Sequence, residues 1–169
     1  SQTFESGDTV TFAPNTYTGY TLNSADGYTS SLSSQTVPDR TSNITQNYYY
    51  NAIQSTVTFD PQGGTVNPTS SVVDYDTTYG SGTGGFPTPV RTGHTFQGWF
   101  TGIGGTGTQV LSGTIVTALS NHTLYAQWTP HTYTVTYDGN GSDGGTPMSQ
   151  SSHTYDVPKA LSKNTYTKT

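Results

Sequence analysis

Gly93-His-Thr-Phe-Gln-Gly-Trp-Phe100 is the stretch of sequence that decides the fold, and it contains one of the two tryptophans of the chain. The other tryptophan ends the segment Thr123-Leu-Tyr-Ala-Gln-Trp128. Each indole can bury about 150–250 Å², roughly 4–6 kcal/mol at the usual area coefficient. Because only 29% of the 169 residues are hydrophobic, these two segments must supply much of the core, and both alternate as β-strands do.

The composition favours short β-strands throughout the chain. Thr, Tyr and Val suit pleated, half-buried surfaces, and the 20 Gly and 9 Pro residues divide the sequence into short segments. No window carries an apolar stripe at helical spacing over three turns, which excludes a helical bundle. The predicted fold class is therefore mainly β, a small α+β arrangement in which any covering helix is short.

Alternation also predicts the inner face of each strand. Val57 and Phe59 share one face of the first strand. Strict alternation would place Phe96 and Trp99 on opposite faces, so we expect a bulge at Gly98 that turns both inward. Shorter strands are expected at 71–75 and 114–116, with irregular glycine-rich loops at 80–85 and 102–107. The predicted structural core consists of Phe59, Phe96, Trp99, Leu124 and Trp128.

Internal repetition is the main organisational signal. Ser55-Thr-Val-Thr-Phe-Asp-Pro-Gln-Gly-Gly-Thr65 recurs as Tyr133-Thr-Val-Thr-Tyr-Asp-Gly-Asn-Gly-Ser-Asp-Gly-Gly-Thr146, and both continue to a pair, Asp74-Tyr75 or Tyr155-Asp156. The order VTFDPQGGT, GHTFQGWF, TLYAQW resembles the Listeria–Bacteroides repeat, also called the internalin-type B repeat, over about residues 55–130. The resemblance implies a β-grasp-like module whose first and last strands lie side by side in one small sheet.

Residues 1–53 are similar to the later part of a mucin-binding-protein (MucBP) repeat. The matching motifs are Gly7-Asp-Thr-Val-Thr-Phe12, Thr18-Gly-Tyr-Thr-Leu22 and Asn43-Ile-Thr-Gln-Asn-Tyr-Tyr-Tyr50. We therefore expect three tandem modules: a partial MucBP-like module at 1–53, a complete Listeria–Bacteroides repeat at 54–130, and the first half of a further repeat at 131–169. Because both outer modules lack strands, we expect completion either by the full-length chain or by head-to-tail assembly of copies into a filament.

The sequence has no pattern that requires catalysis, a cofactor or a metal. No Gly-x-Ser-x-Gly elbow occurs, Glu5 is the only glutamate, and the histidines share no metal-ligand spacing. These histidines are His94, His122, His131 and His153. Asp138-Gly-Asn-Gly-Ser-Asp143 has the alternating oxygens of a calcium loop, but the equivalent Asp60-Pro-Gln-Gly-Gly64 has one carboxylate, which favours a turn. We expect no enzyme, with a carbohydrate-active enzyme as the remote alternative because acid-pair separation in space is not read from sequence.

Charge and composition limit the partners. A net charge of −5 with only 5 Lys and Arg residues excludes the basic footprint that nucleic acid needs. No apolar run is long enough for membrane insertion, and the absence of cysteine excludes disulfides. The family resemblance implies an extracellular location, on a bacterial cell surface and its cell wall or secreted. The expected partners are neighbouring repeats of the same chain or copies of itself.

Two functions remain open at this stage. The first is a structural repeat or stalk segment of a bacterial cell-surface protein that spaces or presents an adhesive region. The second is an adhesin module that binds a host glycan or protein through exposed tyrosines. Consecutive tyrosines in a strand alternate between faces, so at least one ring of the run at 48–50 should point outward. The candidate ligand contacts are Tyr48, Tyr49, Tyr50 and Tyr125.

Overall fold

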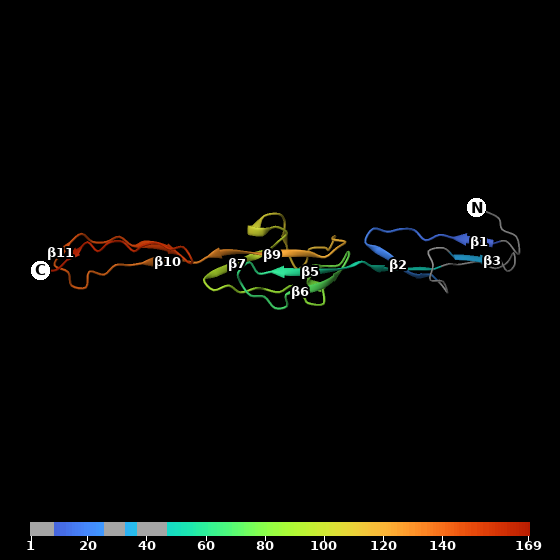
Figure 1. Ribbon diagram of the computed structural model, residues 1–169, viewed down its shortest axis with the longest axis horizontal. Helices are drawn as coiled ribbons and strands as arrows, with labels where there is room; N and C mark the ends of the chain where they lie inside the picture. Colours follow the sequence, from blue (N-terminus) through green and yellow to red (C-terminus); the bar gives the residue numbers. More distant parts are fainter. Residues whose placement is uncertain (1–8, 26–32, 37–46) are drawn as a thin grey trace. The chain divides into compact units, whose positions relative to one another are not determined.

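The computed structural model describes residues 9–25, 33–36 and 47–169 (Figure 1). Glu5, the start of the motif at 7–12 and the first half of the motif at 43–50 lie outside the described residues. Two compact units are present. The first unit comprises Ser1–Thr58, Ser70–Phe86 and Ser112–His122, and the second unit comprises Phe59–Thr69, Pro87–Leu111 and Thr123–Thr169.

Strands dominate the described residues. Strands β1 to β4 are Thr9–Phe12, Tyr20–Ala25, Ser33–Thr36 and Tyr48–Ala52. Strands β5 to β9 are Gln54–Asp60, Ser70–Asp74, His94–Phe100, Gln109–Val110 and His122–Pro130. Strands β10 to β13 are Thr132–Val135, Gly144–Gly145, Ser151–Thr154 and Tyr166–Thr167. Helix in the described ranges is limited to two 3-10 turns, η1 at Tyr79–Ser81 and η2 at Ile103–Gly105, which confirms the mainly β prediction.

The largest sheet has five strands in the order β6-β5-β9-β7-β8. The first and last strands of the predicted repeat, β5 and β9, are therefore neighbours in this sheet, as the family resemblance implied. Four two-stranded sheets accompany it among the described residues, pairing β1 with β3, β2 with β4, β10 with β12 and β11 with β13. All four pairs are antiparallel.

An aromatic cluster forms the centre of the second unit. The Trp99 ring lies 5.0 Å from Phe59 and 5.5 Å from Phe96, and Phe96 lies 5.4 Å from Trp128. The pairing of β7 with β9 shifts between Phe96 and Gly98, which confirms the predicted bulge and explains how both aromatic rings of β7 reach one cluster. The buried members of the predicted core are Phe59, Trp99, Leu124 and Trp128, and Phe96 is half-buried.

The first unit buries alternate residues of the β5–β6 ladder. Val57 on β5 and Val73 on β6 are both excluded from solvent, as period-two alternation requires. The predicted strand at 114–116 is wrong. This segment has a single isolated bridge, from Ile115 to Thr78, although backbone hydrogen bonds also join Val116 to Asp76 and Thr77 and Thr114 to Tyr79. The bridge does not extend into a ladder, because the opposite segment turns into η1 at Tyr79.

Residues 129–169 contain no buried side chain. They form the β10–β12 and β11–β13 ribbons, and an isolated two-stranded ribbon is marginal in water. The stability of these ribbons therefore depends on contacts at the end where β10 begins.

Candidate functional site

A single residue, Ile53, separates β4 from β5 and connects the hairpins on either side through its backbone. Its N–H donates to the carbonyl of Gly19, the residue before β2, at 2.7 Å. Its carbonyl accepts the N–H of Tyr75, the residue after β6, at 2.9 Å. Gly19 has a φ of +82°, and a Cβ there would clash with the Tyr75 ring, so glycine is required for both its conformation and its lack of a side chain. We call Gly19, Ile53 and Tyr75 the first junction.

The same arrangement occurs again around His131, the single residue between β9 and β10. Its N–H donates to the carbonyl of Gly93 at 2.8 Å, and its carbonyl accepts the N–H of Tyr155 at 2.9 Å. Gly93 has a φ of +70°, and a Cβ there would clash with the Tyr155 ring. We call Gly93, His131 and Tyr155 the second junction.

The rings beside the two glycines also have matching geometry. Tyr20 meets Tyr75 at 5.8 Å with an interplanar angle of 80°. His94 meets Tyr155 at 5.6 Å with an angle of 79°. These edge-to-face contacts are the arrangement that aromatic pairs prefer, and they hold the tyrosine of each junction over its glycine.

An aspartate with positive φ follows each junction tyrosine. Asp76 has a φ of 63° and Asp156 a φ of 58°. The Tyr20 hydroxyl donates to Asp76 at 3.5 Å, and desolvation followed by the nearby Asp76 charge raises the pKa of that phenol. At the second junction the aspartate faces a cation instead.

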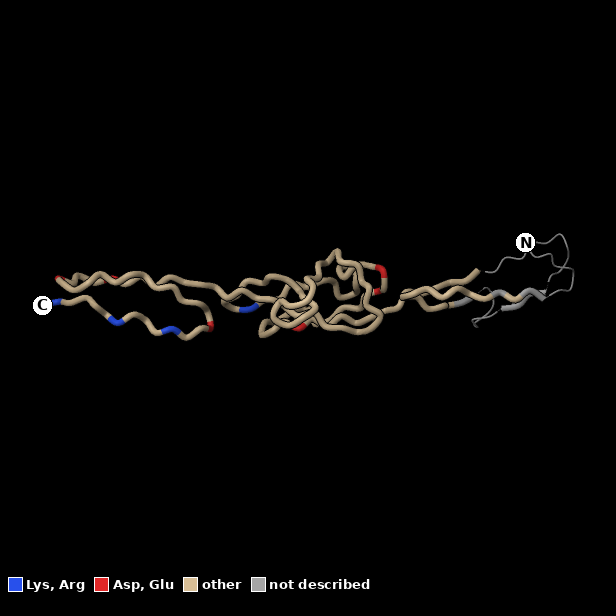
Figure 2. Tube along the Cα trace, turned by 90° about the horizontal axis from the view of Figure 1, so that it is seen from above, with Lys and Arg blue, Asp and Glu red and all other residues tan. Residues whose placement is uncertain are grey.

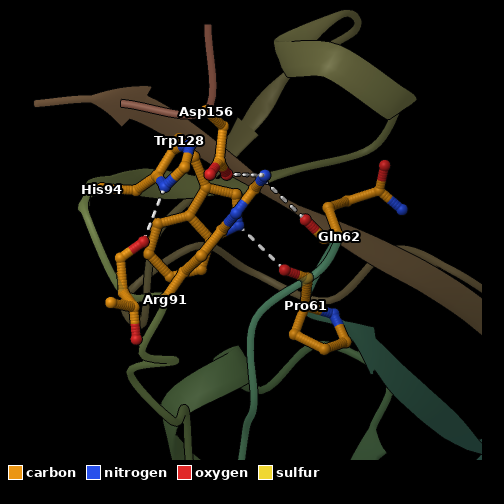
Figure 3. A network of polar contacts seen from close by, with 7 residues as sticks. Pro61, Gln62, Arg91, His94, Trp128 and Asp156 are labelled. Atoms are coloured by element: carbon orange, nitrogen blue, oxygen red, sulfur yellow. Dashed lines mark hydrogen bonds and ion pairs between the residues drawn. The ribbon is translucent and has the colours of Figure 1, made fainter. Parts of the chain in front are cut away.

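That cation is Arg91, which contacts both sides of the second junction (Figure 3). Its guanidinium donates to the carbonyl of Gln62 at 3.0 Å and lies 3.9 Å from the Asp156 carboxylate. The ion pair is solvent-accessible, with side chains 30% and 60% exposed, and such pairs contribute about 0–1 kcal/mol. Next to it the Trp128 indole donates to the carbonyl of Pro61 at 2.8 Å (Figure 3). The backbone hydrogen bonds and the contact of the Tyr155 ring with Gly93 therefore contribute most of the stability of this junction.

The hairpins that lead into the junctions share one register. Tyr20, Thr21 and Leu22 pair with Ala52, Asn51 and Tyr50, as His94, Thr95 and Phe96 pair with Pro130, Thr129 and Trp128. A register shift follows the last pair in both hairpins. Tyr50 of the first unit therefore occupies the position that Trp128 occupies in the second unit.

The hairpins that leave the junctions share a turn. The Asp60 carboxylate accepts the N–H of Gln62 at 2.9 Å, and the Asp138 carboxylate accepts the N–H of Asn140 at 2.8 Å. Gln62 and Asn140 have φ of 47° and 45°. Both are Asx turns, in which an aspartate side chain replaces a backbone acceptor.

We expect a chelator to leave the melting temperature unchanged, because the Asp138 carboxylate is already used by its own turn. The measurement is a thermal melt in EDTA and in millimolar Ca²⁺, with Asp138→Asn as the comparison. A calcium-dependent rise of several degrees that disappears in Asp138→Asn would contradict the assignment.

The predicted ligand tyrosines occupy different environments. Tyr49 is 53% exposed and is the outward ring of its run, whereas Tyr48, Tyr50 and Tyr125 are half-buried. The Tyr50 hydroxyl donates to the Asn15 carbonyl at 2.7 Å, and its ring meets Tyr17 edge-on at 5.0 Å. Desolvation, with a smaller contribution from Tyr17, raises the pKa of the Tyr50 phenol. Tyr48 to Tyr50 belong to the first unit and Tyr125 to the second.

Chemistry-bearing side chains do not converge in the part of the chain that the structure describes. No three His, Asp or Glu residues there are placed to hold a metal ion. Each histidine is hydrogen-bonded to a neighbour: His94 to Thr92, His122 to Tyr79 and Ser120, His131 to Thr95, and His153 to Ser151. Within the same ranges, no helix has the length and apolar character needed to span a bilayer.

Sequence reasoning missed the junctions, although one signal could have found them. Thr18-Gly-Tyr-Thr21 recurs as Thr92-Gly-His-Thr95, a Thr-Gly-aromatic-Thr pattern that places the glycine directly before a strand.

The comparison with known families then identifies the centre of the chain. The model of the Listeria-Bacteroides repeat domain matches residues 56–127. These residues form a Listeria–Bacteroides repeat. We call them the central repeat; the matched range excludes 1–53 and 131–169.

Two relatives from Evansella cellulosilytica resemble parts of the chain. One, described as "Putative membrane protein", is 35% identical over 106 residues, which is 60% of this chain and 14% of the relative. The other, described as "Putative Gly-rich membrane protein", is 38% identical over 60 residues, 32% of this chain and 7% of the relative. The chain thus spans a small part of the length of both relatives. No solved structure matches significantly. The repeat family and these relatives together indicate a cell-envelope or surface protein.

Proposed function

We propose that this chain is a segment of tandem repeats within a longer bacterial surface protein, where it spaces an adhesive region of that protein from the cell. The observation that carries the proposal is the recurrence of the junction. Gly19, Ile53 and Tyr75 make the same two backbone hydrogen bonds and the same ring-on-glycine contact as Gly93, His131 and Tyr155. In repeat proteins, stability is the sum of the repeats and of such nearest-neighbour contacts.

The chemistry of the junction suits a spacer. Each connection between hairpins is one residue, and both of its backbone polar groups are hydrogen-bonded. Each such bond contributes about 0.5–1.5 kcal/mol, and no glycine-rich flexible linker intervenes. A connection of this kind restricts bending between adjacent hairpins, which is what a stalk requires.

The junctions support the module boundaries predicted from sequence. Ile53 and His131 lie at the limits of the proposed modules 1–53, 54–130 and 131–169. The partner of each module is then the neighbouring module of the same chain. Docking of one copy onto another in a head-to-tail filament would use the same backbone groups and is the alternative form of the proposal.

A length series in the intact surface protein tests the proposed function. Residues 54–130 are deleted, kept or duplicated, and the accessibility of an epitope tag placed beyond the segment is measured on whole cells with a bead-coupled antibody. Tag accessibility should rise with the number of copies. An unrelated β-repeat array of equal length, put in place of the segment, should give the same tag accessibility as the segment itself. Accessibility that is independent of copy number, or an array that fails to substitute, would disprove a spacing role.

A further inference from the structure

The two junctions have the same backbone arrangement but different side chains at the positions next to it. Asn51, Gln54 and Asp74 at the first junction occupy the positions of Thr129, Thr132 and Thr154 at the second, because the flanking pairs have the same register. Threonines at these positions are compatible with the junction. The two amides and the carboxylate of the first junction are therefore not needed to join the hairpins and can serve another role.

These three side chains line a groove of about 680 Å³ in the first unit. Tyr50 and Thr21 also line it. The Gln54 amide donates to one oxygen of the half-buried Asp74 carboxylate at 2.8 Å, which fixes the carboxylate. No hydrogen bond among the described residues uses the other oxygen, Asp74 Oδ2, so this acceptor remains available to a ligand.

The polar groups of the groove suit hydroxyl groups. Amides supply both donors and acceptors, and a carboxylate accepts strongly. Tyr50 also lines the groove, and its ring is held by Asn15 and Tyr17. Because consecutive residues of β4 alternate between faces, this ring lies on the opposite face of the strand from the Asn51 amide. Amide and carboxylate groups that line one groove are a surface for a polyhydroxylated ligand.

Charge selects an uncharged ligand. No Lys or Arg lines the groove. Figure 2 colours the Lys and Arg residues of the described ranges blue; they are Arg91, Lys159, Lys163 and Lys168. All four belong to the second unit. An anionic ligand would meet no Lys or Arg side chain among the residues that line the groove. A divalent cation would find one carboxylate where such ions favour several oxygen ligands of high charge.

We propose that the groove beside the first junction, lined by Thr21, Tyr50, Asn51, Gln54 and Asp74, binds a neutral oligosaccharide. The site is independent of the spacing role, since the second junction joins its hairpins without these side chains. A repeat segment that carries such a groove contributes a glycan contact of its own.

The test is binding of the full chain to immobilised neutral hexasaccharides of glucose, N-acetylglucosamine, mannose and galactose, with heparin and galacturonate oligosaccharides as charged comparisons. Calorimetry with the best neutral binder then gives the affinity. The variant Asn51→Thr/Gln54→Thr/Asp74→Thr carries the residues of the second junction, so it should fold with an unchanged melting temperature and bind at least tenfold more weakly.

A matched variant tests the location. Thr129→Ala/Thr132→Ala/Thr154→Ala alters the equivalent positions of the second junction and should leave the affinity within twofold of the unmodified chain. The proposal is overturned if no neutral oligosaccharide binds, if only the charged ones bind, or if the first-junction variant retains full affinity. Equal loss in both variants would also overturn it, because binding would then not depend on the first groove.

Discussion

Replacement of Trp99 by alanine is expected to unfold the central repeat, with a loss of about 3–5 kcal/mol in the free energy of unfolding. The Trp99 side chain is fully excluded from solvent, contacts the Phe59 and Phe96 rings, and donates its indole N–H to the Pro87 carbonyl at 2.8 Å. Alanine would leave a large cavity and an unpaired carbonyl. The free energy of unfolding of a small domain is about 5–15 kcal/mol in total, so the expected loss is a large fraction of it.

Thermal melts followed by circular dichroism and by Trp128 fluorescence measure this effect. Ile103→Ala is the control, since Ile103 is 61% exposed and exposed substitutions usually change stability by less than about 0.5 kcal/mol. A Trp99→Ala melting temperature no lower than that of Ile103→Ala would show that the aromatic cluster does not hold the sheet together.

Replacement of Gly93 by alanine is expected to detach residues 131–169 from the second junction. A non-glycine residue in the left-handed region costs about 1–2 kcal/mol, and the new Cβ would also clash with the Tyr155 ring. Because 129–169 buries no side chain, the ribbons there have no core to retain them. Trypsin should then cleave after Lys159 and Lys163 at least tenfold faster, since about 1.4 kcal/mol corresponds to a factor of ten.

Gly104→Ala is the matched control for backbone strain. Gly104 has a φ of +69°, close to that of Gly93, but a Cβ there has no atom within 4 Å. Its cleavage rate at the same lysines, measured by mass spectrometry over a time course, should equal that of the unmodified chain. Equal rates in the two variants would mean that the ring-on-glycine contact does not hold the ribbons. Tyr155→Ala removes the same contact without backbone strain and should also accelerate cleavage.

The sequence by itself determined the strand pattern, because side-chain alternation is a local property of the backbone. Val57 and Phe59 could be placed on one face from spacing alone, and Gly98 identified the bulge that brings Phe96 and Trp99 together. The Asx turn at Asp138 could be predicted since the carboxylate and the N–H it accepts lie two residues apart. Each of these interactions is encoded within a few consecutive residues.

Tertiary structure alone decided the junctions and the groove. The Ile53 N–H donates to the Gly19 carbonyl, and the Ile53 carbonyl accepts the Tyr75 N–H. The Thr-Gly-aromatic-Thr pattern marks the glycine, but only the folded chain shows which residues it meets. The segment at 114–116 bonds through its backbone to residues 76–79, but it does not extend into a ladder, since residues 79–81 form a 3-10 turn. The groove combines residues of β2, β4, β5 and β6. Its chemistry exists only because the strand registers place those side chains together.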